Sequence, residues 1–580
     1  MSNSPVTPLL RAAGNRYCEQ YQDADSAATR HLCAGVYVDK SFRDLVIRKV
    51  HNDSRRRVAP SYGFDLVPVV RHAWRSWYLD TGLQVAIVGC LVRGLVVGSW
   101  LAVVLVVCAI LVGSMLRVAA RIIAETFQAQ VAAVAEDWFE RRKLRIRPET
   151  PGSLLRKRKR LLKAVLAGCI AVAVTPIVVS NVLGLPLSEA LPAATKIGCD
   201  LVAFAALVGV LRQLLLNAVH GAVSLRPTTL TRREQVIDEQ QSHHCVIYHR
   251  SEPKEDADPL GHSARDDEPS PFVGSGKLIH RWLPPMTIQL LRPGMGDMEQ
   301  REHTTPPFAA HALVERLRVA LQQLGTDPGA ENLSGLQVRD RVYVAEADIS
   351  ADRSLLCHEL GKSDLWRVID DHRSAAHHFL EISVPIAGGE LVTTVLLRVS
   401  MKGRCLSLDV ATCALTRTPH EYQVIDAFAE HGKSAVLRSA VRSAFALPAD
   451  VTRLWSLAEI PVVVARAWWA VKDRTHIPRR GITIGARVAI RMEKAENWQD
   501  AQLDETTIYD HMKIIEQRIL KATEDFLKAH NVSTSVFEKQ ATNIINSGVL
   551  NMGGKTEVNQ SAVGASAQVV VAAGLEGQSA

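Results

Sequence analysis

Residues 164–219 read AVLAGCIAVAVTPIVVSNVLGLPLSEALPAATKIGCDLVAFAALVGVLRQLLLNAV, and this stretch decides the fold class of the chain. It contains two apolar runs, Ala164–Leu185 and Ile197–Val219, separated by a short segment that holds Pro186 and Pro192. About 20 helical residues cross the ~30 Å hydrocarbon core of a bilayer, and each run reaches that length. The pattern therefore predicts a helical hairpin that spans a membrane.

An earlier apolar stretch, Leu83–Leu116, contains Arg93 as its only charged residue. As one helix it is about 50 Å long, which is more than a single span requires. Two complete spans need more residues than it has. The sequence therefore leaves two alternatives, a hairpin that turns near Gly98-Ser99 and one tilted helix.

The flanks of this stretch are strongly basic. Residues 40–80 hold nine Lys or Arg and four acids, and residues 117–163 hold thirteen and five. Short basic flanks tend to stay in the cytoplasm, so the hairpin is the favoured alternative. The two flanks together carry +13, so the rest of the chain, whose net charge is +8, sums to −5. The positive charge thus indicates topology, and we expect no nucleic-acid partner.

Two charged residues lie within the apolar run Ile197–Val219. Asp200 and Arg212 are twelve residues apart, roughly 18 Å along a helix, so they cannot pair with each other. We expect the Arg212 side chain to extend to the membrane surface. Asp200 is expected to cap its helix or to face the other hairpin.

Composition excludes several classes of protein. The chain has 580 residues, is 47% hydrophobic, and has a mean hydropathy of +0.04, too low for a protein that lies mostly in a bilayer. Its ten cysteines form no CxxC pair, which argues against zinc ribbons and thioredoxin-like motifs and fits a reducing cytoplasm. Met1–Arg11 lacks the basic-then-apolar order of a signal peptide.

The second half has the pattern of an α+β domain. Phe379–Pro385 alternates apolar and polar residues, and Leu391–Val399 and Cys405–Leu415 predict a hairpin that turns near Lys402-Gly403. Leu336–Ile349 predicts a further strand. Helical patterns occupy 308–323, 434–446 and 453–473.

Two helical segments have alternative interpretations. The 453–473 segment, which includes Trp468-Trp469, is either a buried helix or a membrane-surface helix with tryptophan at the interface. The 504–531 segment has an apolar stripe at four-three spacing, which either packs on the α+β domain or associates with a second copy. The stripe consists of Ile508, Met512, Ile515, Ile519, Ala522 and Phe526.

No catalytic, cofactor-binding or metal-binding residue is assigned from the sequence. Gly553-Gly554-Lys555-Thr556 lacks the earlier glycine of a phosphate-binding loop. Two groups of side chains have the right chemistry for metal ligands but match no known ligand spacing, so we expect solvated loop side chains. They are His243, His244, Cys245 and His249, and Asp370, Asp371, His372, His377 and His378.

The second half resembles a group of uncharacterised multi-pass membrane proteins from actinobacteria. The residues that carry the resemblance are Pro271–Gly276, Gly389–Thr394 and Ile544–Asn551. The resemblance covers roughly the last 310 residues and implies a membrane protein without assigned catalytic residues.

The predicted fold class is α+β, with transmembrane helical hairpins joined to a cytoplasmic α+β domain and followed by a C-terminal helix and a low-complexity tail. The predicted organisation is a cytoplasmic N-terminal region (1–80), a first membrane hairpin or long helix (81–116), a basic cytoplasmic helical segment (117–163), a second membrane hairpin (164–219), an acidic linker (220–270), a cytoplasmic α+β domain (271–500), an amphipathic helix (501–532) and an Asn/Gly/Ser-rich tail (533–580).

The leading functional hypothesis is an inner-membrane protein, with both termini cytoplasmic, that acts as a sensor, anchor or scaffold. Its expected partners are the lipid bilayer, a second copy bound through 504–531 and the tail, and an unidentified cytosolic protein. No cofactor is expected. The alternatives are a membrane-anchored enzyme, such as a hydrolase, with a site in 271–500, and an oligomeric channel or transporter.

Overall fold

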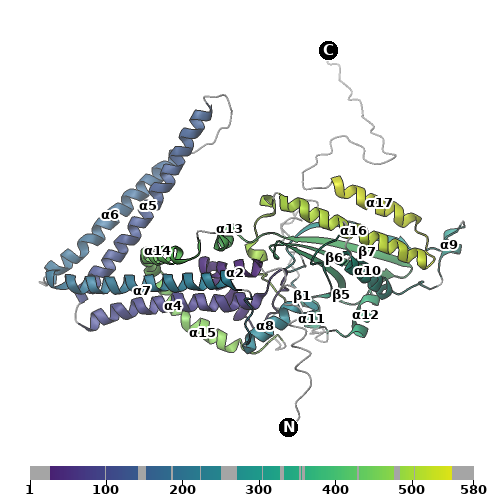
Figure 1. Ribbon diagram of the computed structural model, residues 1–580, viewed down its shortest axis with the longest axis horizontal. Helices are drawn as coiled ribbons and strands as arrows, with labels where there is room; N and C mark the ends of the chain where they lie inside the picture. The colour runs from purple at the N-terminus through teal and green to yellow at the C-terminus, as the bar shows by residue number, and fades with distance from the viewer. Residues whose placement is uncertain are drawn as a thin grey trace, which may run out of the picture.

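A computed structural model describes residues 27–550 of the chain, except 98–99, 141–151, 184–186, 223, 250–270, 295, 304, 327–331, 352–354, 356–359, 428–429, 476–483 and 502. The acidic segment that follows residue 250 and the tail beyond Leu550 therefore lie outside the described residues. Figure 1 shows two parts, a group of long helices and a sheet covered by helices.

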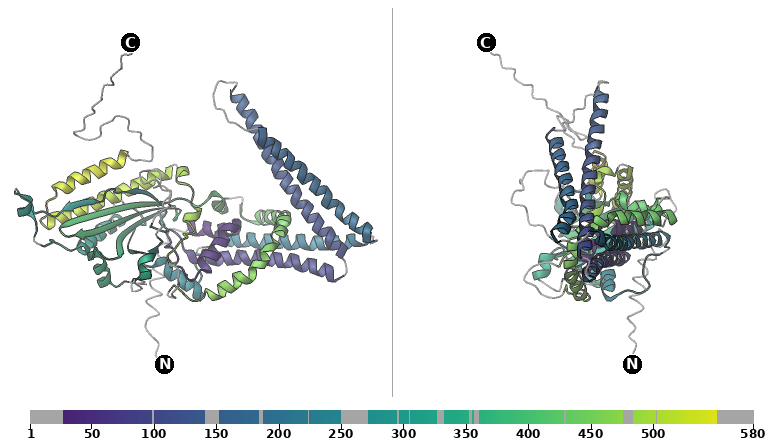
Figure 2. Two further views of the ribbon diagram at one scale, coloured as in Figure 1. Left: turned by 180° about the vertical axis from the view of Figure 1, so that it is seen from behind. Right: turned by 90° about the vertical axis from the view of Figure 1, so that its left-hand side faces the viewer.

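Four long helices form the first part. α4 (Leu66–Val96) and α7 (Leu187–Gly221) run antiparallel, and α5 (Trp100–Glu140) and α6 (Gly152–Leu183) form a second pair that leaves the first at an angle (Figures 1 and 2). Because α4 ends at Val96 and α5 begins at Trp100, two helices occupy the first apolar stretch, which agrees with the hairpin alternative.

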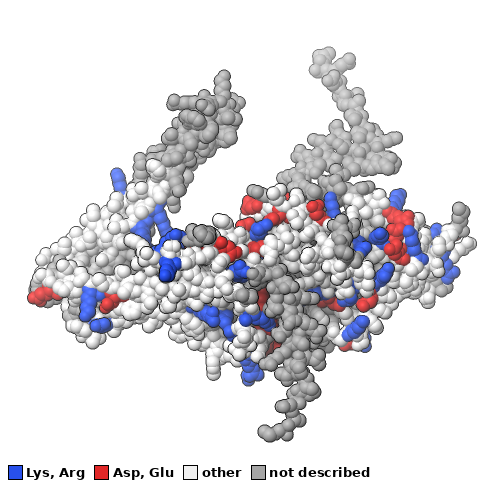
Figure 3. All heavy atoms as spheres, in the orientation of Figure 1, with Lys and Arg blue, Asp and Glu red and all other residues white. Residues whose placement is uncertain are grey.

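All four helices are long and apolar enough to cross a membrane. The qualifying segments are Leu66–Val96, Trp100–Ala124, Leu161–Val182 and Ser188–Gly221. Many of their apolar side chains face outward, such as Ile170 and Val182, which are 66% and 76% exposed. Charged side chains are sparse on the described surface of this part (Figure 3). The coarse expectation of a membrane protein is therefore supported, and α4 begins earlier than residue 81.

The N-terminal segment packs around the first half of α4. It consists of α2 (Ala27–Val38), α3 (Lys40–Leu45) and a π-helix, η1 (Val46–His51). Asp39 and Asp65 cap the N-termini of α3 and α4 by accepting backbone N–H bonds. α8 (Arg232–Ser242) joins the same core and begins with a capping box made by Thr231 and Glu234.

Seven strands of the described chain form one sheet in the order β1-β4-β5-β6-β7-β2, with β3 also on β7. β1 runs parallel to β4, and the other pairs are antiparallel. The strands are β1 (Cys245–Tyr248), β2 (Lys277–Arg281), β3 (Met286–Gln289), β4 (Gln337–Ala345), β5 (Ala376–Ile386), β6 (Leu391–Lys402) and β7 (Cys405–Leu415). The four strand patterns read from the sequence correspond to β4–β7, and Gly403 lies in the β6–β7 turn.

The sequence patterns did not predict β1 or β3. β1 and α8 lie inside 220–270, which the sequence analysis assigned to an acidic linker. That assignment is wrong for residues 232–248, because β1 completes the edge of the sheet beside β4.

Helices cover one face of the sheet. α10 (Ala310–Leu324), α12 (Lys362–Asp370) and α16 (Leu503–Ala529) pack there (Figure 1). The entire apolar stripe of α16 is buried within the chain, which agrees with packing on its own domain. Self-association stays a prediction. α17 (Ser535–Leu550) follows, so the helical part of the chain extends beyond the expected start of the tail at residue 533.

The loop before α4 contacts the opposite face of the sheet. Tyr62, in the loop before α4, donates a hydrogen bond from its hydroxyl to Glu381 Oε2 (2.7 Å), and Glu381 forms a fully buried ion pair with Arg341 (3.0 Å). Gly63 and Gly389 approach so closely that a Cβ on Gly389 would lie 2.1 Å from the Gly63 carbonyl oxygen. The remaining short elements are α9 (Met298–Arg301), α11 (Glu346–Ala351), α13 (His420–Gln423), η4 (Val424–Asp426), η7 (Met492–Lys494) and η8 (Trp498–Asp500).

A helical strap returns from the sheet to the long helices. It comprises α14 (Lys433–Thr452), η6 (Leu454–Glu459) and α15 (Ile460–Trp469). α14 lies directly on α7, where Ser439 donates a hydrogen bond to the Gly209 carbonyl (2.9 Å). In α15, Trp468 and Trp469 are 75% and 55% exposed and only Val463 is buried, so α15 is a surface helix and not the buried helix of the first alternative.

The sheet core contains a carboxyl group that should make stability depend on pH. Burial raises the pKa of Glu516 on α16 to about 7, although a hydrogen bond from Trp282 Nε1 (2.8 Å) opposes the shift. Burial also lowers the pKa of His280, 3.6 Å from the carboxylate, so His280 supplies no compensating charge. The folded pKa of Glu516 thus exceeds the ordinary value of 4.5. Below pH 4.5 the carboxyl is protonated in both the folded and the unfolded state, and the free energy of unfolding has its full value. As the pH rises through about 7, the proton is lost and this part of the free energy of unfolding is lost with it.

We therefore expect Glu516→Gln, which keeps an acceptor for Trp282, to remove this loss. As the pH rises from about 4.5 to about 8, the variant should gain progressively up to about 3 kcal/mol in free energy of unfolding relative to wild type. Unfolding of the full-length protein across this pH range measures the difference. Asp525→Asn, an exposed position on the same helix, is the control and should show no such gain. Parallel stability curves for wild type and Glu516→Gln would contradict the prediction.

Candidate functional site at the base of the long helices

A cluster of opposite charges lies where α4 and α7 meet the N-terminal segment. The Asp80 carboxylate accepts hydrogen bonds from Arg43 Nη1 (2.6 Å) and Arg212 Nη2 (2.6 Å), and Lys40 Nζ lies 3.0 Å away. Arg212 therefore pairs across helices with Asp80, and the expectation that it extends to the membrane surface is wrong. The pairing offsets the cost of placing a guanidinium on an apolar helix.

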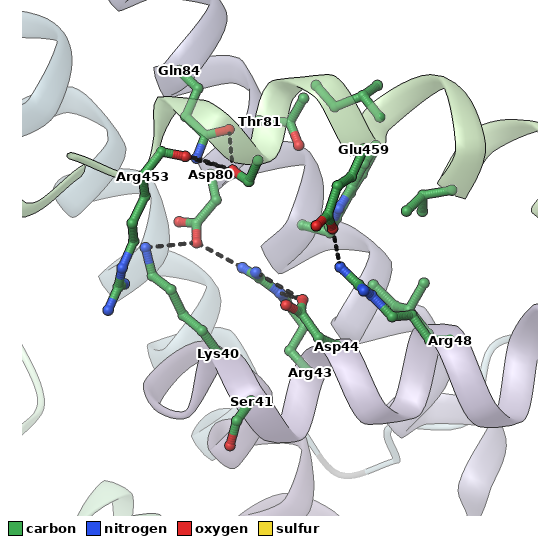
Figure 4. Close-up of a pocket in the computed structure, with 15 residues that line it drawn as sticks. Lys40, Ser41, Arg43, Asp44, Arg48, Asp80, Thr81, Gln84, Arg453 and Glu459 are labelled. Carbon is green, nitrogen blue, oxygen red and sulfur yellow. Dashed lines mark hydrogen bonds and ion pairs between the residues drawn. The ribbon is translucent and has the colours of Figure 1, made fainter. Parts of the chain in front are cut away.

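A hollow of about 340 Å³ opens beside this cluster (Figure 4). Its walls come from α3, η1, α4 and the strap. Arg48 and Glu459 form an ion pair on one side, and Gln84 and Ser456 are hydrogen-bonded (2.9 Å) on the other. Most charged groups of this first hollow thus have partners inside it, which indicates a structural role in holding the strap against α4.

A second hollow, of about 610 Å³, lies on the far side of Arg48 and is strongly basic. We call it the basic hollow. Six cationic side chains and one carboxylate, Asp53, line it together with Trp469. The cations are Arg48, Lys49, Arg55, Arg56, Arg466 and Arg474. Such an excess of positive charge in a concavity attracts anions.

Hydrogen bonds fix the walls of the basic hollow. Arg233, from α8, donates to the carbonyls of Val50 (2.8 Å) and His51 (2.9 Å) at the end of η1. Burial lowers the pKa of Arg233 to about 10, which still leaves it charged at neutral pH. Asn52 Nδ2 donates to the Val463 carbonyl (3.2 Å), and the Arg474 N–H donates to the Ser54 carbonyl (2.9 Å). The loop after η1 is thereby fastened to the strap and to the segment behind it.

A chain of charged hydrogen bonds connects α7 to the sheet. His220 Nδ1 lies 3.1 Å from Asp426, whose other oxygen lies 2.8 Å from His31 Nε2. His31 Nδ1 lies 2.7 Å from Glu390 at the start of β6. Although burial lowers the pKa of His31, its hydrogen bonds to the two carboxylates outweigh burial and raise it. The protonated imidazole can donate to both carboxylates at once, which links the two parts of the molecule.

The two ligand groups considered in the sequence were expected to be solvated loop side chains, which is wrong for Cys245 on β1 and for His377 and His378 on β5, since Cys245 and His378 are buried. Among the described residues, no group of three or more His, Cys, Asp or Glu side chains could hold a metal ion. His249 pairs with Glu346 (3.3 Å), and Asp370 pairs with His311 (2.6 Å). His378 pairs with Asp340 (2.9 Å). Neither hollow is lined by a member of the 370–378 group.

The basic hollow could not be predicted from the sequence, because its walls come from two distant segments, 48–56 and 466–474. The run Arg55-Arg56-Arg57 is visible in the sequence, but its position before an apolar stretch favours topology as the explanation. Arg466 and Arg474 flank the Trp468-Trp469 pair and gave no signal of their own.

Comparison with known proteins shows a similarity over part of the chain. Residues 284–559 match the family model described as an AbeC-like domain. No curated protein and no solved structure matches the chain. The match is consistent with the predicted relation to an uncharacterised family, and the actinobacterial origin stays a prediction. It begins after β2 and runs past the end of α17, so it includes β3–β7 of the sheet and the strap.

Proposed function

We propose that the protein is an integral membrane protein that anchors its α+β domain at the cytoplasmic face of the inner membrane and acts there as a scaffold or sensor. The observation that carries the proposal is the set of four apolar helices with outward-facing apolar side chains. Outward-facing leucine, isoleucine and valine over such lengths fit a lipid environment. The AbeC-like match gives no specific activity.

The junction between the two parts supports a coupled role for the domain. α7 reaches the sheet through His220, Asp426, His31 and Glu390 in sequence, with each contact between 2.7 and 3.1 Å. Arg491 adds hydrogen bonds to the carbonyls of Tyr62 (2.7 Å) and Glu390 (2.6 Å). A helix displacement in the membrane would therefore act on the start of β6. A cytosolic protein that binds the domain, and a second copy of the chain, remain proposed partners.

Cysteine labelling of intact cells tests the topology. The proposal places Glu189, exposed at the start of α7, outside the cytoplasm and Glu421, exposed on α13, inside it. A membrane-impermeant maleimide should label Glu189→Cys in intact cells and Glu421→Cys only after permeabilisation. Both variants are made with Cys199→Ala, because Cys199 is exposed on α7.

The control is the Cys199→Ala parent, whose signal is subtracted from both variants. Labelling of Glu421→Cys in intact cells would place the α+β domain outside and contradict the proposed orientation. Recovery of the full-length protein in the soluble fraction, without detergent, would contradict membrane insertion itself.

A further inference from the structure

We propose that the basic hollow is a binding site for the phosphate group of an anionic ligand, which Arg55, Arg466 and Arg474 contact directly. The ligand is either an anionic phospholipid head group or a soluble phosphate compound. Both present the same chemistry to the site. The inference names a ligand class for the proposed sensor, but the binding of soluble phosphate stands independently of membrane insertion.

Several cationic side chains of the basic hollow have no counter-charge among the described residues. Arg48 pairs with Glu459 and Arg56 lies 3.6 Å from Asp53, but Lys49, Arg55, Arg466 and Arg474 make no side-chain hydrogen bond or ion pair with another described residue. The Asp80 cluster nearby shows the contrary arrangement, in which one carboxylate serves three cations. Like charges brought together without counter-charge repel each other, and a bound anion removes that repulsion.

The chemistry of these side chains also favours a phosphate ligand. Three of the four unpartnered cations are arginines, whose planar guanidinium matches phosphate oxygens in a bidentate manner. They approach from one helix and two loops, with Arg466 on α15, Arg55 on the loop after η1 and Arg474 in the segment that follows α15. A phosphate in the hollow can accordingly be contacted from several sides.

The walls of the basic hollow are held in place by hydrogen bonds before any ligand binds. The end of a helix presents carbonyl oxygens, which repel an anion. Arg233 donates hydrogen bonds to the carbonyl oxygens of Val50 and His51, so these oxygens at the end of η1 already have a positively charged partner. The loop that carries Arg55 is fastened at Asn52 and Ser54. Fixed walls reduce the entropy that a ligand must remove on binding.

The size of the basic hollow and its expected depth in the membrane both suit a phosphate ligand. A volume of about 610 Å³ exceeds the volume of one inorganic phosphate and lies in the ordinary range for ligand sites. Trp469 lines the hollow and is 55% exposed, and its neighbour Trp468 is 75% exposed. Exposed tryptophans of membrane proteins concentrate at head-group depth, so a lipid phosphate would be within reach of the arginines.

The test uses full-length protein in a nonionic detergent and two probes. Inorganic pyrophosphate represents the soluble source, and short-chain phosphatidylglycerol represents the lipid source. Short-chain phosphatidylcholine, which is zwitterionic with no net charge, is the reference. Binding is measured by titration calorimetry and by the shift in unfolding temperature. We expect at least one of the two phosphate probes to bind wild type and stabilise it, more weakly at high salt.

The variant Arg55→Gln/Arg466→Gln/Arg474→Gln should bind that probe about a hundredfold more weakly, at about 1 kcal/mol for each cation removed. Its unfolding temperature without ligand should be equal to or higher than that of wild type, because these side chains make no hydrogen bond or ion pair with another described residue and their removal relieves the repulsion between them. The matched control, Arg367→Gln/Arg373→Gln/Lys402→Gln, removes the same charge from exposed positions on the sheet domain and should bind like wild type.

The outcomes separate the possibilities. Binding of pyrophosphate alone assigns a soluble ligand. Binding of phosphatidylglycerol but not of phosphatidylcholine assigns a lipid. Either result supports the proposed site if the hollow variant loses the binding and the control variant keeps it. The proposal is overturned if wild type binds neither probe, or if the hollow variant and the control lose binding equally. Because pyrophosphate binding is measured in detergent, its outcome is independent of the labelling experiment on topology.

Discussion

Replacing Asp80 with asparagine should lower the free energy of unfolding of the full-length protein by about 3–5 kcal/mol. The asparagine side chain has nearly the shape of the aspartate but no charge. Arg43, Lys40 and Arg212 would then lose the carboxylate that they share, and the Arg43 side chain is only 8% exposed. Arg43 would keep Asp44, and Lys40 would keep Asp450. Removing one partner from a buried ionic group costs more than the group contributes when intact, because the remaining charges stay buried.

Asp44→Asn is the matched control. Asp44 also pairs with Arg43 (3.0 Å), but its side chain is 40% exposed, so water can replace it. We expect this variant to lose less than about 1 kcal/mol. Chemical unfolding in detergent, followed by tryptophan fluorescence, measures both variants. Equal losses for Asp44→Asn and Asp80→Asn would show that burial of the cluster contributes nothing beyond a surface ion pair.

A double variant separates repulsion from other effects of the substitution. Asp80→Asn combined with Arg212→Gln removes one of the three cations that face position 80, while Arg43 keeps its pair with Asp44 and Lys40 its pair with Asp450. If the loss in Asp80→Asn comes from buried like charges, the double variant should be more stable than the single variant. A double variant that is less stable would assign the loss to the hydrogen bonds themselves.

Gly389→Ala should destabilise the protein by about 3 kcal/mol or more, since two costs add. The first is conformational, because Gly389 has φ +83°, a region that alanine rarely adopts. The second is steric, because the new Cβ would lie 2.1 Å from the Gly63 carbonyl oxygen. A backbone oxygen cannot move aside like a flexible side chain, so the loop before α4 would have to separate from the sheet.

Gly403→Ala distinguishes the two costs. Gly403 lies in the β6–β7 turn with φ +61°, and a Cβ there meets no atom within 4 Å. This variant should show only the conformational cost, about 1 kcal/mol. Thermal unfolding of both variants and wild type provides the comparison. If Gly389→Ala were no worse than Gly403→Ala, the close contact between Gly389 and Gly63 would be incidental to stability.

Local patterns explain which parts of the fold could be predicted. β5, β6 and β7 alternate apolar and polar residues or turn at a glycine, and the α16 stripe repeats at helical spacing, so each signal lies within a single segment. β1 has only four residues, CVIY, and becomes a strand because it pairs with β4, about a hundred residues away. No local signal records such a partner.

The candidate site could not be predicted for the same reason. The pairing of Arg212 with Asp80 spans 132 residues, and the walls of the basic hollow are separated by more than 400. α15 illustrates a further limit: its apolar run fits both a buried helix and a surface helix, and periodicity does not distinguish them. Only the exposure of Trp468 and Trp469 decides between the two.

The contact between Tyr62 and Glu381 has a consequence for biosynthesis. Tyr62 leaves the ribosome 319 residues before its partner, and the four long apolar helices are made in the interval. During that time Tyr62 and Gly63 lack the sheet surface that they cover in the finished protein. A nascent chain that stops before β5 therefore exposes unfinished N-terminal surface to chaperones and proteases, and nonsense mutations anywhere in about the first 380 codons should yield rapidly degraded fragments, not a functional membrane anchor.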